Sequence, residues 1–271
     1  MNLRKQLLTK NDCYKANRKI TPKGIMVHST GANNPNVSRY VPGDAVLGKN
    51  LYNNHWDKGD VQKCVHAFIG KFADGSVGTV QTLPWNWRGW HCGKGSKGSG
   101  NDTHISFEIC EDFLTDASYF NAAYKEAVEL TAMLCKEYNL DPTKDGVVIC
   151  HSEGYKRGIA SNHGDVMHWF PKHSKSMDTF RADVKAAMAE KKQEAKQETV
   201  SLTLDVLRRG DVKTSVKSLQ VLLDGLGYPC GGADGSFGSK TENAVKKFQT
   251  AHKITANGIV GAQTWLALLG R

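Results

Sequence analysis

Two histidines far apart in the sequence are the residues best suited to chemistry. His28 follows the apolar run Ile25-Met26-Val27, and His151 follows the apolar run 147–150. Each run is typical of a buried strand, so each histidine is expected at a strand end, where side chains from remote segments can meet. Imidazole is a common zinc ligand, and residues 161–168 supply further His and Asp donors. The pattern predicts a zinc site, whereas a single histidine alone would be read as a structural residue.

A glutamate on a third predicted strand offers a general base. In the strand 105–109, alternation places the three apolar side chains on one face and Glu108 on the other, with Ser106 and Cys110. If the polar face is turned toward the histidines, the Glu108 carboxylate is suited to take a proton from an attacking water. Otherwise Glu108 is a solvated or ion-paired strand residue.

The elements that must position these side chains are strands and helices in one domain. A helical pattern extends from Tyr119 to Tyr138. Apolar runs predict strands over residues 65–69, 77–83, 105–109 and 147–150. We therefore expect an α/β or α+β domain over residues 1–188, with a central mixed sheet flanked by helices.

A change in composition separates a second domain. Residues 185–200 are almost wholly Ala, Lys, Glu and Gln, which predicts a helical tail running into a semi-rigid charged linker, placed at 189–201. Residues 202–271 then predict a small domain of three short helices. The first helix ends before Gly227, and Thr264 is expected to cap the third.

Composition narrows the classes of partner. No apolar stretch is long enough to span a bilayer, so we expect no membrane insertion. Seven cysteines without a CxxC pair predict reduced thiols. The net charge of +9 suits a polyanionic partner, but the basic residues are scattered and carry no nucleic-acid-binding motif, so no nucleic acid is expected. Residues 1–10 lack the apolar core of a secretory signal, which predicts a cytoplasmic protein. A monomer is assumed.

The C-terminal domain resembles the type 1 peptidoglycan-binding domain. It carries the motifs Asp234-Gly235-x-Phe237-Gly238-x-x-Thr241 and Asn257-Gly258-Ile259-Val260-Gly261-x-x-Thr264-Trp265. The resemblance implies binding of wall stem peptides or glycan in a shallow groove beside Asp234 and Gly235.

Residues 20–180 resemble the zinc-dependent N-acetylmuramoyl-L-alanine amidase family, type 2. The matching motifs are Val27-His28-Ser29-Thr30, the strand 65–69 with the turn Asp74-Gly75, Gly89-Trp90-His91-Cys92-Gly93, Ile105-Ser106-Phe107-Glu108 and Cys150-His151-Ser152-Glu153. The resemblance implies that His28 and His151 bind zinc and that Glu108 is the catalytic acid/base. The bond cleaved would be the amide joining N-acetylmuramic acid to L-alanine in peptidoglycan.

The third ligand departs from the family pattern. Where the family often has Lys-x-Asp nearer to the second histidine, this chain has His163-Gly164-Asp165. We interpret residues 155–160 as an enlarged loop and Asp165 as the third ligand, with His163 stabilising the oxyanion. An extended stretch would place both side chains on one side. His168 is the main alternative ligand, and Cys150 a weaker one because it should point away from the site.

Aromatic residues near the predicted site could bind the wall. Trp85, Trp87, Trp90 and His91 could line a sugar or peptide groove, and for the three tryptophans core packing stays equally open. Of the four, Trp90 and His91 are the residues predicted to contact substrate. The two domains together resemble a phage or prophage endolysin, which is made in the cytoplasm of the infected or lysogenic bacterium and acts on the cell wall after release. A bacterial autolysin is the close alternative. The competing class is a non-catalytic peptidoglycan-recognition protein, and Asp165 favours the enzyme.

Overall fold

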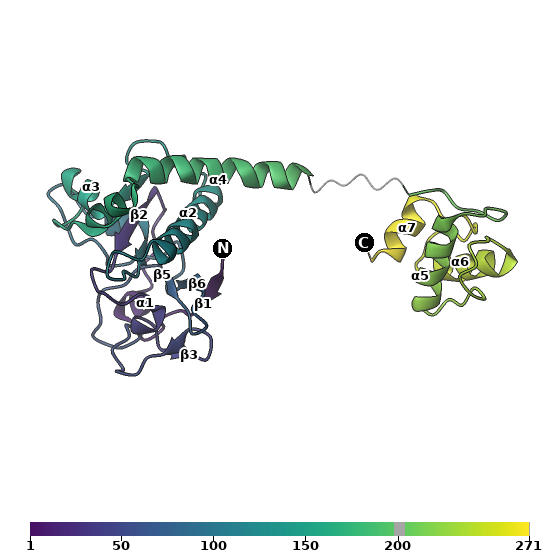
Figure 1. Ribbon diagram of the computed structural model, residues 1–271, viewed down its shortest axis with the longest axis horizontal. Coiled ribbons are helices and arrows are strands. Elements are labelled where there is room, and N and C mark those ends of the chain that lie inside the picture. The colour runs from purple at the N-terminus through teal and green to yellow at the C-terminus, as the bar shows by residue number, and fades with distance from the viewer. Residues whose placement is uncertain (198–203, 271) are drawn as a thin grey trace. The chain divides into compact units, whose positions relative to one another are not determined.

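The chain forms two compact units, Met1–Gln197 and Glu198–Arg271. The computed structural model describes residues 1–197 and 204–270, and over residues 190–197 it describes the backbone alone (Figure 1). Within these residues, no helix combines the length and the apolar character needed to cross a membrane. All seven cysteines are free thiols, as predicted.

The first unit is built on a six-stranded mixed sheet of order β1-β6-β5-β7-β2-β8. Within this sheet, β5 and β6 pair antiparallel and all other neighbouring strands pair parallel. The strands are β1 Leu3–Lys5, β2 Gly24–Ser29, β5 Ala67–Lys71, β6 Val77–Gln81, β7 His104–Ile109 and β8 Val148–Cys150. Two short strands, β3 Gly43–Asp44 and β4 Gly48–Lys49, pair with each other. The predicted mixed sheet is confirmed, and each predicted strand is present with its ends shifted by a few residues.

Two long helices cover one face of the sheet. Figure 1 shows α2 and α4 side by side over the strands, and the buried side chains of both helices join those of β2, β5, β7 and β8 in one apolar cluster. The helices of this unit are α1 Asp12–Ala16, α2 Ala117–Glu137, α3 His151–Lys156 and α4 Met177–Gln197, with 3-10 turns η1 Val37–Arg39, η2 Gly100–Asp102, η3 Asp165–His168 and η4 Phe170–His173.

The opposite face of the sheet is covered by loops and short elements. Alternation along β7 places Ile105, Phe107 and Ile109 in the cluster under the two helices, as predicted. The intervening residues face the loops, where Phe68 and Cys110 pack in a second apolar cluster. This loop-covered face therefore carries the polar side chains Ser106 and Glu108 of β7.

The charged segment between the units is partly helical. α4 continues to Gln197, so residues 189–197 of the predicted linker belong to a helix. Residues 198–201 of that linker lie outside the described residues. The Ala, Lys, Glu and Gln composition suits this extension because all four residues have high helix propensity.

The second unit contains the three predicted helices, α5 Thr214–Gly225, α6 Ser239–Ala251 and α7 Ala262–Leu268. Gly227 has a φ of +84° just beyond α5, which confirms the predicted helix stop. The prediction for Thr264 is wrong. Gly261 caps α7, and Thr264 lies inside the helix with its hydroxyl accepting a hydrogen bond from Gln249 Nε2 at 3.1 Å.

A buried glutamine holds the loop that enters α6. Gln220 Nε2 donates to Asp234 Oδ1 at 2.8 Å and to Thr241 Oγ1 at 3.1 Å. In return, the backbone N–H of Gly235 donates to Gln220 Oε1 at 2.8 Å. One side chain thereby fixes both ends of the turn, in which Gly235 has a φ of +81°.

The same arrangement recurs one helix later. Gln249 Nε2 donates to Asn257 Oδ1 at 3.2 Å as well as to Thr264, and the N–H of Gly258 donates to Gln249 Oε1 at 2.9 Å. We call residues 234–236 and 257–259 the clamped loops. The second unit is therefore an internal repeat of helix, clamped loop and helix.

Candidate metal centre

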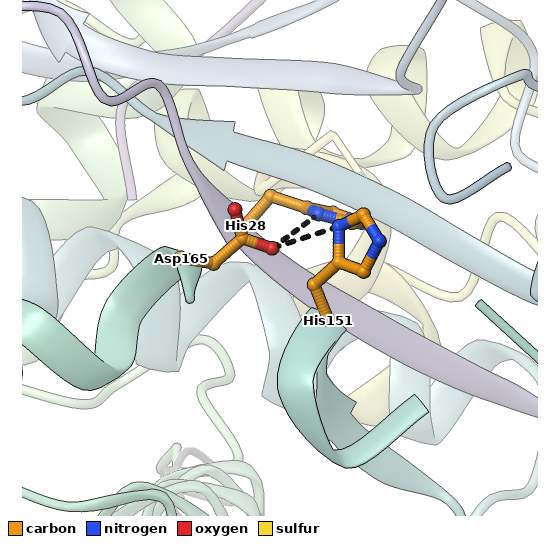
Figure 2. Close-up of side chains that lie close together, drawn as sticks. All are labelled: His28, His151 and Asp165. Carbon is orange, nitrogen blue, oxygen red and sulfur yellow. Dashed lines mark hydrogen bonds and ion pairs between the residues drawn. The ribbon is translucent and has the colours of Figure 1, made fainter. Parts of the chain in front are cut away.

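Three side chains from remote parts of the first unit converge on the loop-covered face. Oδ2 of Asp165 lies 3.0 Å from Nδ1 of His28 and 3.0 Å from Nδ1 of His151 (Figure 2). His28 is the fifth residue of β2, and His151 begins α3 directly after the neighbouring strand β8. Among the described residues, these three form the only group of His, Cys, Asp and Glu suited to hold a metal ion.

Both histidines are oriented by contacts on their other ring nitrogen. Nε2 of His28 lies 2.9 Å from Nδ1 of His91, and Nε2 of His151 lies 3.2 Å from the hydroxyl of Ser161. The backbone N–H of Ser161 donates to the carbonyl of Cys92, so the two supporting segments are joined to each other. Such contacts fix the ring and the tautomer that presents Nδ1 to a metal.

The carboxylate of Asp165 is held in a strained and polarised position. Its φ is +39°, in the left-handed region that costs a non-glycine residue roughly 1 kcal/mol or more. Burial raises the pKa of Asp165, but the contacts with His151 and His28 outweigh burial and bring the pKa below its usual range. Burial lowers the pKa of His28, which favours the neutral imidazole that a metal requires.

The geometry of these donor atoms fits zinc. Zinc binds histidine nitrogen and carboxylate oxygen at about 2.0–2.2 Å in tetrahedral sites, which separates ligand atoms by about 3.3 Å. The distances from Asp165 to the two imidazoles are 3.0 Å, and all three donor atoms lie within 4.8 Å of one another. Two nitrogens and one oxygen leave a fourth position free of protein ligands.

Glu108 is placed beside this group by the sheet. In the parallel pairing of β2 and β7, Glu108 lies opposite His28, and on its other side it lies opposite Phe68 of β5. Burial raises the pKa of Glu108 well above its usual value, and the nearby charge of Asp165 raises it further. Its Oε2 is buried and has no hydrogen-bond partner in the described part of the chain. The polar face of β7 is thus turned toward the histidines.

His163 lies beside the group, although not for the reason we predicted. Its exposed ring lies beside that of His151, with ring centroids 4.8 Å apart and the ring planes tilted by 32°. The expected extended stretch is wrong, because Gly164 adopts helical dihedrals and Asp165 begins η3 in the left-handed region. The enlarged loop is also shorter than expected, because α3 includes Tyr155 and Lys156.

The alternative ligands have other contacts. Nε2 of His168, at the end of η3, lies 3.0 Å from Oε1 of the buried Glu111. Cys150 packs in the apolar cluster under α2 and α4, on the face of the sheet opposite Glu108. Neither belongs to the group of converging donors in the described structure.

The tryptophans near the site differ in exposure. Trp85 packs against the main core, and Trp87 lies against Tyr14 with a centroid distance of 4.8 Å and the ring planes tilted by 40°. Trp90 is 43% exposed and lines a cavity of about 320 Å³ with Arg18, Arg88 and Gln62 among its walls. Core packing therefore accounts for Trp85, Trp87 is half-buried against Tyr14 outside the core clusters, and Trp90 remains available to a ligand.

The predicted substrate residues occupy different settings. His91 lies behind His28, where it supports a predicted ligand, and its other nitrogen, Nε2, has no partner in the described structure. Asp234 accepts hydrogen bonds from Gln220 and from the N–H of Ser236, and Gly235 is engaged by the same glutamine. In the second unit these two residues thus stabilise a clamped loop.

Sequence reasoning missed the residues that support the site. Ser161 and Glu111 contact site residues, and the residue types alone did not distinguish them from other buried polar groups. The repeated spacing of Asp234 to Thr241 and of Asn257 to Thr264 was a signal that could have revealed both clamped loops. In each, the acidic or amide residue precedes the threonine by the same number of positions.

Comparisons with known proteins agree with this arrangement. Residues 17–171 match the N-acetylmuramoyl-L-alanine amidase family, and residues 213–268 match the putative peptidoglycan binding domain. A probable N-acetylmuramoyl-L-alanine amidase of Bacillus licheniformis is 27% identical over 259 residues, covering 91% of this chain and 66% of that protein. N-acetylmuramoyl-L-alanine amidase CwlH of Bacillus subtilis strain 168 is 31% identical over 178 residues, covering 65% of this chain and 67% of that protein.

The chain thus spans about two thirds of the length of these relatives. The solved structure of PlyL is 22% identical with a TM-score of 0.47, over 68% of this chain and 98% of that one. The match over residues 17–171 includes the three converging donors and Glu108, and it covers more than half of the sequence. The chain belongs to the N-acetylmuramoyl-L-alanine amidase family.

Proposed function

We propose that this protein hydrolyses the amide bond between N-acetylmuramic acid and L-alanine in peptidoglycan, with zinc held by His28, His151 and Asp165. The observation that carries the proposal is the convergence of the three donor atoms beside Glu108, whose strand position opposite His28 places a buried carboxylate next to the metal ligands. A zinc ion bound there supplies a Lewis acid and a water acidic enough to be activated near neutral pH.

The chain's own residues then perform the proton transfers. Glu108, whose pKa is raised by burial, takes a proton from the attacking water and returns it to the leaving amine of L-alanine. A raised pKa suits both steps, because the same carboxyl must accept and release a proton near neutral pH. The exposed ring of His163, which lies beside His151, donates to the oxyanion of the tetrahedral intermediate.

We place part of the wall substrate in the cavity at Trp90. The indole offers a flat apolar surface for a sugar or peptide, and the exposed guanidinium of Arg18 offers a partner for a carboxylate. The cavity belongs to the chain segment that supports the site, since His91, the next residue after Trp90, contacts His28. Trp90→Ala should raise KM for muramyl peptides more than it lowers kcat, while Trp87→Phe serves as the control.

The second unit would hold the enzyme on the wall. Its match to a peptidoglycan-binding domain and the net charge of +9 of the whole chain both suit a polymer rich in carboxylate and phosphate. Tethering raises the local concentration of catalytic unit at an insoluble substrate without a tight site. Removal of residues 202–271 should leave turnover of small soluble muramyl peptides nearly unchanged and weaken attack on whole walls. Loss of zinc in the truncated protein would contradict this division of labour.

The biological setting we propose is that of a phage-type endolysin, a bacteriolytic and hence antimicrobial enzyme. It would be made in the cytoplasm and act on the wall after release. The seven free thiols, six of them buried, suit synthesis in a reducing compartment. A bacterial autolysin would use the same chemistry. Neither reading requires nucleic acid, membrane insertion or a second subunit.

Product analysis tests the proposed reaction. Purified protein is incubated with defined peptidoglycan, and the new ends are identified by mass spectrometry. We expect free lactyl groups on muramic acid and peptides with L-alanine at their amino terminus. New reducing sugars would show that the bond is wrong. An inactive protein without stoichiometric zinc, measured by elemental analysis, would indicate a peptidoglycan-recognition protein instead.

A further inference from the structure

A buried glutamate outside the ligand set joins two segments that carry ligands. The side chain of Glu111 is 3% exposed, and its Oε1 lies 3.0 Å from Nε2 of His168, which is an ion-pair distance, although the angles at this contact are not those of a hydrogen bond and Oε1 has no hydrogen-bond partner among the described residues. The backbone N–H of Glu111 donates to Oγ1 of Thr30 at 3.1 Å. Thr30 lies two residues after His28, and His168 lies three residues after Asp165. Glu111 therefore contacts both the end of β2 and the end of η3.

The position of this carboxylate is unfavourable by itself. Burial of a carboxylate is strongly destabilising unless the charge is paired. Glu111 is also close enough to Glu108 for its charge to contribute to the raised pKa of that residue, after burial and Asp165. A third acid beside two others therefore needs a compensating partner, and His168 is the group that faces it.

The partner is attached to the strained ligand. η3 has four residues, with Asp165 at its start and His168 at its end. Val166 and the following Trp169 are fully buried and anchor one side of this turn in the core. His168 is 42% exposed, so packing does not fix it, and its contact with Glu111 supplies the restraint on that side. A left-handed residue persists only when the surroundings determine it, which makes this restraint relevant to Asp165.

We propose that Glu111 is a positioning residue of the metal site. It acts through His168 on η3 and through Thr30 on β2, and so keeps the carboxylate of Asp165 within reach of His28. His168 then belongs to the support of the site and is not a ligand. The inference rests on the proposed zinc function.

Zinc affinity in full-length variants tests the inference. The dissociation constant for Zn²⁺ alone is measured by competition with a chromophoric chelator in wild type, Glu111→Leu, Glu111→Gln, His168→Gln and the double variant Glu111→Leu/His168→Gln. Support around metal ligands is typically worth 10–100-fold in affinity, and for this less direct contact we expect about tenfold in Glu111→Leu and in His168→Gln. Glu111→Gln keeps an acceptor and should lose less. The double variant should lose no more than either single variant, because both break one contact.

A matched control separates positioning from general destabilisation. The carboxylate of Asp183 accepts hydrogen bonds from Tyr124 and Lys175, both at 2.8 Å, and within the described residues none of its hydrogen bonds reaches a segment that carries a ligand. Asp183→Asn should lower the stability of the metal-free protein and leave zinc affinity unchanged. The absorption spectrum of the Co²⁺-substituted protein adds a second readout, which should change in Glu111→Leu and not in Asp183→Asn.

The outcomes are distinct. Unchanged zinc affinity in Glu111→Leu and His168→Gln, with tight binding by wild type, overturns the positioning role and leaves the proposed function intact. An equal loss of affinity in Asp183→Asn also overturns it. Failure of wild type to bind zinc overturns both proposals.

Discussion

The clamped loops and the metal centre contain similar polar side chains, but these side chains have different roles in the two regions. In the second unit, Gln220 and Gln249 engage the loop amides and side chains so fully that each glutamine both donates and accepts. In the first unit, the three candidate ligand atoms meet at one point, where Oδ2 of Asp165 lies 3.0 Å from Nδ1 of both His28 and His151. Glu108 Oε2 and His91 Nε2 are buried and unpaired in the described structure, and Asp165 is strained.

This difference separates structure from chemistry within one chain. Buried polar groups normally have hydrogen-bond partners. A fully hydrogen-bonded network such as that of the clamped loops is therefore explained by its contribution to the stability of the fold. An unsatisfied cluster with shifted pKa values and a strained residue lowers stability and persists only where something else uses it. Removing a residue should therefore affect zinc and turnover in one region and folding in the other.

The largest effect is expected from loss of the carboxylate ligand. Asp165→Ala should lower zinc affinity by well over about a hundredfold, since a lost ligand costs more than a lost outer contact. His168→Ala should retain stoichiometric zinc after purification with the metal present, with the smaller affinity loss described above. Elemental analysis after dialysis measures zinc per chain. Full zinc in Asp165→Ala with depleted zinc in His168→Ala would reverse the assignment of the third ligand.

Turnover should separate from metal binding at the neighbouring carboxylate. Glu108→Gln should keep zinc and lose about 10²–10⁴-fold in kcat, because a general base is needed for proton transfer and not for coordination. The measurement combines zinc per chain with the rate on a soluble muramyl peptide. A variant that loses zinc together with activity would make Glu108 part of the metal site.

Sequence patterns predicted the parts of the site that depend on strand periodicity. His28 and Glu108 lie on one face because alternation along β2 and β7 is fixed by the buried apolar residues between them. The third ligand depended on a family motif that this chain alters. Its placement on a left-handed residue at the start of a 3-10 turn has no periodic signal, and the expected extended stretch was wrong for that reason.

The support of the site was beyond sequence reasoning for a related physical cause. The contacts of His91 with His28 and of Glu111 with His168 join segments far apart in the chain. A side-chain contact of this kind is set by how loops cover the sheet, and loops carry little periodicity. In the second unit, short helices and glycine-containing turns are local features, so the three helices followed from the sequence even though the glutamine clamps did not.

Removal of either clamp glutamine is expected to lower the free energy of unfolding of the second unit moderately and to leave the metal site unaffected. Gln249→Ala removes the partner of Asn257, Thr264 and the N–H of Gly258, and leaves buried polar groups unpaired at a cost of about 2–3 kcal/mol. Denaturant unfolding of the second unit measures the loss. Gln263→Ala, at an exposed position of α7, is the matched control. Zinc affinity and turnover of soluble substrate should stay unchanged, and a change in either would break the contrast between the two regions.

A smaller effect, at His66, tests whether the hydrogen bonds of a buried polar group decide its role, and not the unit in which the group lies. His66 is fully buried in the first unit, yet its Nδ1 accepts from the N–H of Ser106 at 3.0 Å and its Nε2 contacts the carbonyl of Trp87 at 2.7 Å. Burial lowers the pKa of His66 to about 4. Protonation would also remove the acceptor that the N–H of Ser106 uses. Both ring nitrogens of His66 thus have partners, as the polar groups of the clamped loops do, although His66 lies in the catalytic unit.

The sign of its pH dependence follows from that lowered pKa. Above a pH of about 6.5 the histidine is neutral in both states, and as the pH falls toward 4 the unfolded chain binds a proton that the folded chain does not. The unfolding free energy of the metal-free protein should therefore decrease on acidification, and between pH 7 and pH 5 His66 should contribute about 2 kcal/mol of that decrease. His66→Gln should flatten the pH dependence by this amount, whatever its stability at pH 7, and denaturant titrations at the two pH values measure the slope. The same slope in the variant and the wild type would mean that His66 is not kept neutral by its surroundings, and the contrast between satisfied and unsatisfied groups would then not extend into the catalytic unit.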